Sequence, residues 1–271
     1  MPAMAIDGAE ITSRVLAERP WLFSAAEALH GALTLAADLL LPPVCISCRK
    51  RAGAHGLLCG DCWAGIDFIV PPLCSRLGVP LPYDTGEPAL SAAAIADPPV
   101  YDRARAAARY CSTMRHLIQS FKYGDRHEGV PLFGRWMAAG AELLTGADVI
   151  VPVPLYRSRL WSRRFNQSAM LAQEVGKLTG VPVDCFLLAR VKRTQAQVGL
   201  TAAQRRKNVA GAFRVTAAKG ALREKRIVVV DDVITTGATA EACARVLKRA
   251  GAARVDILAL ARAVEPSALL L

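Results

Sequence analysis

The sequence predicts an α/β protein in which a mainly parallel sheet is flanked by helices and joined to a small N-terminal cysteine-rich module. Two apolar runs of strand length, 227–230 and 255–261, are separated by one helical segment, as in a strand–helix–strand unit. The first run leads directly into two acids and a hydroxyl-rich turn. Two C-x₂-C pairs lie close together ahead of the α/β part.

The acid pair follows a run of four apolar residues, most of them β-branched. A run this short and this uniformly apolar indicates a central parallel strand that is buried on both faces. Ligands of open α/β sheets bind beyond the carboxyl ends of the strands. We therefore expect Asp231 and Asp232 at the mouth of a binding site.

The turn after the acids has the composition of a phosphate site. Its backbone N–H groups would open the next helix, where unpaired donors and the helix dipole favour an anion. Its threonines add hydroxyl donors, and its glycine permits a close approach. The residues concerned are Thr235, Thr236, Gly237, Ala238 and Thr239.

Carboxylates beside a phosphate repel it unless they meet hydroxyls or a metal. The implied ligand is therefore a sugar phosphate, with its phosphate in the turn, its hydroxyls on the acids and Mg²⁺ nearby. The alternative is a strand capped by two acids that merely start a helix. Capping accounts for one Asp or one Thr, but not for the whole pattern.

Composition limits the class of protein. The 271 residues allow one large or two modest domains, and 53% hydrophobic residues are enough for a core. A formal net charge of +11 suits anionic ligands or nucleic acid. No secretory signal is evident, and the apolar segment 25–41 is interrupted by charged residues, whereas a membrane span needs about 20 largely uncharged ones. We expect a cytoplasmic protein without a membrane span.

The cysteine spacing predicts a metal site. Cys45, Cys48, Cys59 and Cys62 form paired knuckles that supply four thiolates for tetrahedral zinc. Four cysteines close the coordination shell, so we expect a structural ion that provides much of the module's folding free energy. A redox C-x₂-C pair is the main alternative, but it would more naturally be single and open a helix of a βαβ unit.

The chain divides into four parts. Residues 1–43 form an N-terminal helical extension that ends at two prolines, and residues 44–70 form the zinc ribbon. Residues 71–99 are rich in Pro, Gly and Ala without a sustained period, which predicts a linker. The α/β domain occupies 100–265, and no internal repeat is evident.

Hydrophobic patterns place the elements of the α/β domain. Expected in chain order are a strand-like run from 100, a helix ending near 123, a strand at 149–151, a helix from 165 through 177, strands at 183–189 and 213–215, and the final unit with its helix at 240–250. The basic stretch 190–208 has no strong period and predicts a mobile loop.

Cations accompany two of these segments. Arg157 and three further arginines lie just past Pro154 and Leu155, beyond the strand at 149–151, where they point to a negatively charged ligand. A solvated basic face explains that local pattern equally well. Lys192 and Arg205 lie in the stretch 190–208, which could close over a phosphorylated ligand and exclude water. The alternative is a charged surface connection.

These motifs carry a family resemblance. Residues 227–239 resemble the phosphoribosyl pyrophosphate (PRPP) signature of type I phosphoribosyltransferases. The chain from about 40 to 263 resembles the ComF family, a competence-associated group that joins a cysteine-rich zinc module to a phosphoribosyltransferase-like domain. Besides the cysteine pairs and the acid pair, the resemblance rests on Phe121-Lys122-Tyr123-Gly124, Val151-Pro152-Val153-Pro154, Arg164-Phe165-Asn166-Gln167, Thr194-x₂-Gln197-x₂-Leu200 and Arg205-x₂-Asn208-Val209-x-Gly211-Ala212-Phe213.

The resemblance implies a role for each segment of the site. Asp231 and Asp232 would meet the ribose hydroxyls and Mg²⁺, and the turn 235–239 would hold the 5′-phosphate. Residues 154–159 would lie near pyrophosphate, with 192–205 as the flexible loop. The implied cofactors are structural zinc and Mg²⁺ bound with PRPP.

Three departures from the family pattern stand out. Members often have a second cysteine pair after the ribbon, but here Cys74 is followed by Leu77 at the place of its partner. Arg164 replaces a customary glycine, which puts a close backbone contact there in doubt. Thr235 stands where purine-salvage transferases tend to carry an acid, which counts against hypoxanthine or guanine as the acceptor.

The resemblance implies a PRPP-binding protein that acts in DNA uptake or DNA processing. Single-stranded DNA and competence proteins are the macromolecular partners it suggests. Two alternatives stay open. One is an active Mg²⁺-dependent phosphoribosyltransferase of nucleotide metabolism, and the other is a PRPP-sensing regulator without turnover.

Overall fold

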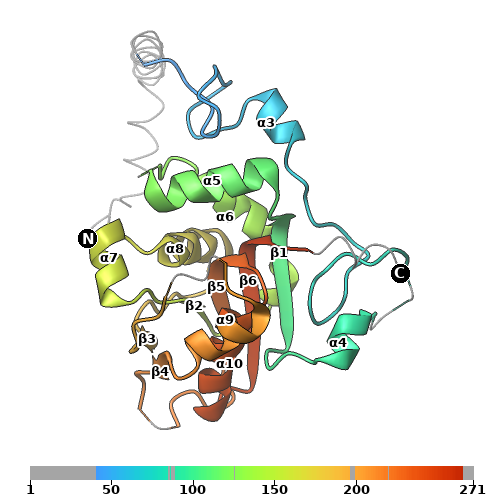
Figure 1. Ribbon diagram of the computed structural model, residues 1–271, viewed down its shortest axis with the longest axis vertical. Coiled ribbons are helices and arrows are strands. Elements are labelled where there is room, and N and C mark those ends of the chain that lie inside the picture. Colours follow the sequence, from blue (N-terminus) through green and yellow to red (C-terminus); the bar gives the residue numbers. More distant parts are fainter. Residues whose placement is uncertain are drawn as a thin grey trace, which may run out of the picture.

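A four-stranded, all-parallel sheet lies at the centre of the structure (Figure 1), with the strand order β1-β6-β5-β2. The structure is a computed structural model that describes residues 41–84, 86, 89–124, 126–195, 199–218 and 220–264. The strands are β1 (Arg103–Arg109), β2 (Val149–Pro152), β5 (Arg226–Ile234) and β6 (Arg254–Arg262). The predicted parallel sheet is confirmed.

The two central strands are buried on both faces, as their uniformly apolar sequences predict. The side chains of Val229 and Val230 point to opposite faces, and each is 0% exposed. Strand β5 continues to Ile234, so Asp231 and Asp232 lie within its last part rather than after its end. The acids are therefore held by the sheet's hydrogen bonds and not by a loop.

Helices cover both faces of the sheet. On one face lie α5 (Ser112–Tyr123), α6 (Val130–Ala138) and α8 (Gln167–Thr179), packed on the side chains of Val228 and Val230. On the other lies α10 (Ala238–Arg249), packed on Ile227 and Val229. A short 3₁₀ helix, η1 (Ala141–Leu143), precedes β2.

A second, two-stranded sheet stands beside the main one. It pairs β3 (Leu188–Arg190) antiparallel with β4 (Phe213–Val215). Part of the intervening stretch, predicted to be a mobile loop, is the helix α9 (Ala202–Val209), so that part of the prediction is wrong. A capping box between Thr201 and Gln204 satisfies the first N–H groups of this helix and explains how so polar a segment becomes helical. Residues 196–198 lie outside the described part of the chain.

The helix α7 (Arg157–Arg163) follows β2 and ends at Arg164, which has a left-handed backbone with a φ of 63°. Only glycine adopts this conformation without a steric cost. This left-handed backbone explains why the family pattern has a glycine at the position that Arg164 occupies here.

The cysteine-rich segment is attached to the edge of the main sheet. Figure 1 shows it passing from α3 (Gly60–Ala64) along the outer side of β1 to α4 (Ala92–Ala96). Backbone hydrogen bonds join it to β1, with Arg109 N donating to Asp67 O at 2.7 Å and Ala104 N donating to Arg76 O at 2.7 Å. The segment predicted to be a linker thus includes a helix and a stretch docked on the sheet.

An aromatic cluster fixes the first ribbon on the α/β domain. The ring of Trp63 lies 5.5 Å from that of Phe68 and 5.7 Å from that of Trp136 on α6, measured between centroids. Such tilted and edge-on contacts stabilise aromatic pairs beyond the area they bury. Through Trp63 and Phe68 the ribbon therefore packs against α6 of the main domain.

Most of the predicted N-terminal helical extension, residues 1–40, and the C-terminal residues 265–271 lie outside the described chain. No helix within the described ranges has the length and apolar character needed to cross a membrane.

Candidate functional site

The acid pair lies in a network of three elements. Ser168, in the first turn of α8, donates its hydroxyl to Asp231 Oδ1 at 3.0 Å, and the backbone N–H of Asp232 donates to the same oxygen at 2.9 Å. Lys122, near the end of α5, places its Nζ 2.9 Å from Asp232 Oδ1 and 2.8 Å from Asp232 Oδ2. Helices α5 and α8, which are both distant from β5 in sequence, thus contact the acids near its end.

Burial and charge act in opposite directions on this network. Burial, followed by the negative charge of Asp232, raises the pKa of Asp231 to about 7, although Lys122 and the hydrogen bonds oppose the shift. Burial also disfavours the charged ammonium of Lys122, but the attraction of Asp232 outweighs it and raises that pKa. Asp231 is therefore poised to change its protonation state near neutral pH.

The hydroxyl-rich turn leads from β5 into α10. Gly237 is the N-cap of that helix, with a φ of 81° and without a capping side chain. The positive end of the α10 dipole thus lies directly after the acid-bearing strand, where it favours an anion. Arg205 of α9 donates from Nη1 to Thr235 Oγ1 at 2.8 Å, which brings a cation to the turn. The exposed Thr236 and half-buried Thr239 lie on either side of the cap.

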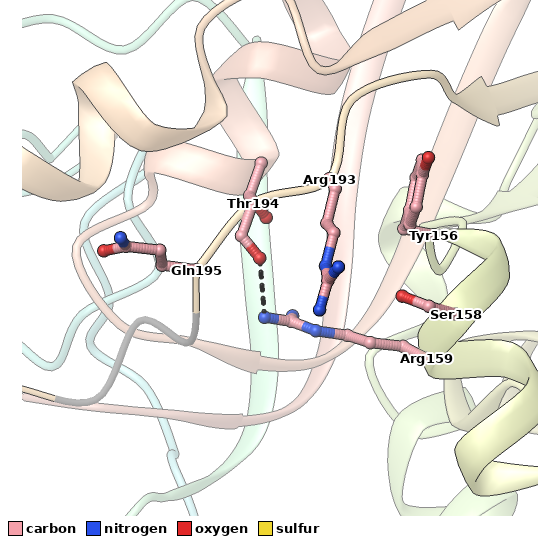
Figure 2. Close-up of a pocket in the computed structure, with 6 residues that line it drawn as sticks. All are labelled: Tyr156, Ser158, Arg159, Arg193, Thr194 and Gln195. Carbon is pink, nitrogen blue, oxygen red and sulfur yellow. Dashed lines mark hydrogen bonds between the residues drawn. The ribbon is translucent and has the colours of Figure 1, made fainter.

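A basic pocket of about 480 Å³ lies between α7 and the segment after β3 (Figure 2). The guanidinium groups of Arg159 and Arg193 point into it, and Arg159 Nη2 donates to Thr194 O at 3.1 Å. Its other lining residues are Tyr156, Ser158 and Gln195. None of these six described residues is acidic, so no carboxylate among them neutralises the positive charge of Arg159 and Arg193.

Electrostatics link the pocket to the acid pair. Burial, and then the neighbouring charge of Arg163, lowers the pKa of Arg159. Burial likewise lowers the pKa of Arg190, with Arg159 adding to the effect and Asp231 opposing it. Arg190 therefore interacts electrostatically with both Arg159 of the pocket and Asp231 of the acid pair. Buried like charges of this kind favour a bound polyanion.

The remaining predicted site residues take different positions. Pro154 and Leu155 are half-buried in the connection between β2 and α7, beside the end of β5, where Val153 N donates to Val230 O at 2.9 Å. Arg157 is exposed at the start of α7. Lys192 Nζ lies 3.5 Å from Ala210 O, and Lys192 is not among the residues that line the basic pocket.

The sequence assigned no role to Lys122, Ser168 and Arg190, whereas Arg159 belongs to the segment 154–159 that it placed near pyrophosphate. Lys122 and Ser168 lie in motifs that the sequence displays, but nothing local says that they meet the acids across 110 and 63 residues of chain. Their roles follow from the packing of α5 and α8 on one face of the sheet.

The four ribbon cysteines fit a tetrahedral ion. Their sulfur atoms all lie within 4.8 Å of one another, and Cys48 Sγ lies 3.6 Å from Cys59 Sγ. Zinc–sulfur bonds of about 2.3 Å in a tetrahedron separate the sulfurs by about 3.8 Å. Ser47 N also donates to Cys45 Sγ at 3.4 Å. The donor set therefore suits zinc.

The thiols carry unequal pKa values. Burial raises the pKa of Cys45, but hydrogen bonds from the backbone at Cys59, Cys48 and Ser47 outweigh it and bring it down to about 6. Burial and the neighbouring thiols raise the pKa of Cys62 to about 12. A bound dication removes this mutual repulsion, because it stabilises every thiolate at once.

Two family models match the chain. Residues 36–95 match a double zinc ribbon domain, and residues 164–267 match a phosphoribosyl transferase domain. Together with the parallel sheet and the four-cysteine cluster, these matches identify a phosphoribosyltransferase-type fold joined to a structural zinc ribbon.

Several curated proteins are similar over most of the chain. Competence protein F of Haemophilus influenzae is 30% identical over 226 residues, which cover 81% of this chain and 96% of that protein. DNA utilization protein YhgH of Salmonella typhi is 33% identical over 232 residues, 83% of this chain and 99% of its own length. YhgH of Escherichia coli K12 is 31% identical over 231 residues, which cover 83% of this chain and 99% of that protein.

The raised pKa of Asp231 predicts a pH-dependent cost of folding. In the unfolded chain an aspartate titrates near 3.9, so between about pH 4 and pH 7 the native state binds more protons and loses stability as pH rises. Asp231→Asn should therefore raise the melting temperature at pH 8 by about 3 °C or more, and by less at pH 5.

Differential scanning calorimetry at both pH values tests this expectation. Asp148→Asn is the matched control. The backbone N–H of Arg226 donates to the Asp148 carboxylate and lowers its pKa, so replacing this carboxylate should lower the melting temperature at pH 8. An Asp231→Asn protein that is no more stable than wild type at pH 8 contradicts the assignment.

Proposed function

The chain belongs to the competence protein F family, and on that basis we propose that it is a cytoplasmic protein that binds PRPP with Mg²⁺ and acts in DNA utilisation. The observation that carries the proposal is that Asp231 and Asp232 lie near the end of β5, just before the N-terminus of α10, while Arg190 interacts electrostatically with both Asp231 and Arg159 of the basic pocket. The names of its relatives, which refer to competence and DNA utilization, support the cellular role.

PRPP has three chemical parts, and the site offers a partner for each. The carboxylates of Asp231 and Asp232 accept hydrogen bonds from the ribose hydroxyls. The N–H groups of the turn 235–239 donate to the 5′-phosphate at the positive end of the α10 dipole. Arg159 and Arg193 neutralise the pyrophosphate in the basic pocket. When bound, Mg²⁺ offsets the charge between the acids and the pyrophosphate.

Lys122 has a defined part in this proposal. It forms an ion pair with the buried Asp232 before any ligand arrives, at 2.8 Å. Arg205 contacts the turn through Thr235 and adds a cation on the side of the 5′-phosphate. Both residues help an anionic ligand to bind next to two acids.

Two readouts separate ligand binding from the enzymatic alternative. Phosphoribosyl transfer breaks the bond from the anomeric carbon to pyrophosphate, so it requires pyrophosphate release that depends on an acceptor. Binding alone, as in a sensor, leaves PRPP intact. The site's electrostatic groups would serve a transfer by stabilising the departing pyrophosphate.

Replacing both acids tests the proposed PRPP site directly. In isothermal titration with PRPP at saturating Mg²⁺, Asp231→Asn/Asp232→Asn should weaken binding by about 30-fold or more, because charge-assisted hydrogen bonds to the sugar are lost. Asp148→Asn, outside the site, should leave the affinity unchanged. Equal affinity in the double variant and wild type would reject the site.

Lys122→Met tests the internal counter-charge. Lys122 lowers the pKa of Asp231, so its loss leaves the repulsion from Asp232 less opposed and raises the pKa of Asp231 further. PRPP affinity at pH 7 should fall by about tenfold, since one pKa unit corresponds to a factor of ten, and part of it should return at pH 8.5.

Lys122→Arg, which keeps the charge, is the control and should bind PRPP much as wild type does at both pH values. Tighter binding by Lys122→Met at pH 7 would mean that the lysine only competes with the ligand, and would contradict this role.

An exposed aromatic flanked by arginines favours single-stranded DNA as a second ligand. Trp161 on α7 is 85% exposed, and Arg157 and Arg164 lie at the two ends of the same helix. Base stacking on an aromatic ring contributes about 1–3 kcal/mol, and arginines attract the backbone. We infer that α7 contacts single-stranded DNA.

Trp161→Ala should weaken binding of a labelled oligonucleotide by about tenfold in fluorescence anisotropy, with wild-type affinity falling steeply as salt is raised. Phe186→Ala is the control, because Phe186 is 84% exposed but lies outside α7. An equal effect of both substitutions, or none from Trp161→Ala, contradicts the inference.

A further inference from the structure

Residues 73–96 repeat the backbone pattern of the zinc ribbon that precedes them. In the first ribbon, Cys45 N donates to Lys50 O at 2.7 Å and Arg49 N donates to Cys45 O at 3.1 Å. A β-bridge pairs Val44 with Arg51 around this turn. These three contacts define a knuckle that presents the Cys45 sulfur to the metal site.

The same three contacts recur around Cys74. Cys74 N donates to Val79 O at 2.8 Å, Gly78 N donates to Cys74 O at 2.8 Å, and a β-bridge pairs Leu73 with Pro80. Each partner has the same offset from its cysteine as in the first knuckle. The left-handed residue also falls at the same place, with a φ of 65° at Gly78 where Arg49 has 66°.

The helices that follow the two knuckles match as well. Cys59 is the N-cap of α3 and Ser91 is the N-cap of α4, and each helix has five residues. The alignment therefore pairs the four metal ligands with four residues of the second unit: Cys45 with Cys74, Cys48 with Leu77, Cys59 with Ser91 and Cys62 with Ala94.

The second set of residues does not fit a zinc ion. Leu77 and Ala94 have no ligand atom, and the sulfur of Cys74 is hydrogen-bonded instead. It accepts from Ser91 Oγ at 3.3 Å, from Ser91 N at 3.3 Å and from Leu77 N at 3.4 Å. Three protein donors thus satisfy a sulfur that is 0% exposed.

Contacts with the main sheet take the place of the metal in holding this unit. Arg105 Nη1 donates to Ser75 O at 3.1 Å, next to the backbone hydrogen bond between Ala104 and Arg76. A side chain at Gly78 would lie 2.2 Å from Ala104 O, so the knuckle sits directly on the backbone of β1. The knuckle of the first ribbon, in its described residues 44–52, has no backbone–backbone hydrogen bond to the main sheet, and its backbone contact is the side chain of His116 on α5, whose Nε2 lies 3.1 Å from Ser47 O.

We propose that residues 73–96 are a second zinc ribbon that folds without metal, so that this chain binds one zinc ion where a double zinc ribbon would bind two. Only the first of the two ribbons then needs a metal ion to fold. Zinc holds the first ribbon, and docking on β1 holds the second. This proposal is independent of PRPP binding.

Metal analysis of the purified protein gives the first test. Wild type and Cys74→Ser should each contain one zinc per chain, and Cys59→Ser should contain none. Two zinc ions in wild type, or loss of zinc in Cys74→Ser, would overturn the proposal. Restoring the ligands with Leu77→Cys/Ser91→Cys/Ala94→Cys should raise the content to two, and a folded triple variant that still holds one would refute the ribbon homology.

Hydrogen exchange gives a second test that needs no substitution and holds if the triple variant fails to fold. Removing zinc with a chelator should abolish protection of the amides at 45–52, while the amides of Cys74 and Gly78 keep theirs. Loss of protection in both units on chelation would overturn the proposal.

Discussion

Two adjacent carboxylates on a buried strand are the constraint around which the α/β domain is arranged. Asp231 and Asp232 cannot both be ionised there without compensation, because burial and mutual repulsion favour protonation. The compensation comes from Lys122 on α5 and Ser168 on α8, whose helices pack on the same face of the sheet. The core thus fixes the electrostatics of the site as well as its shape.

The two halves of the chain handle concentrated charge in different ways. In the α/β domain, the acids and the basic pocket are separate groups of charge, and Arg190 interacts electrostatically with Asp231 of the first and Arg159 of the second. In the first ribbon, four thiols gather where a dication neutralises them together. In the second ribbon the ligands have gone, and hydrogen bonds to Cys74 satisfy the one sulfur that is left.

Patterns confined to one segment were predictable from the sequence. The strands β5 and β6, the helix between them and the four-cysteine cluster follow from apolar runs and spacing. The helix α9 was missed although Thr201 and Gln204 form a capping box, because its polar surface has no hydrophobic period. The Lys122–Asp232 pair depends on a contact across the fold. The repeated knuckle is local, but its repeat is hard to see in the sequence because Leu77, Ser91 and Ala94 stand where the first ribbon has cysteines.

The release of a proton from Asp231 on ligand binding is the most direct measure of whether the acids meet the sugar. A site that takes hydroxyl donors and Mg²⁺ needs the ionised form, so binding must release the proton that Asp231 holds at its pKa of about 7. Titrating Mg²⁺-saturated PRPP calorimetrically at pH 7, in buffers of different ionisation enthalpy, should show release of about half a proton that disappears in Asp231→Asn. Binding with the same proton release in wild type and Asp231→Asn would contradict the account.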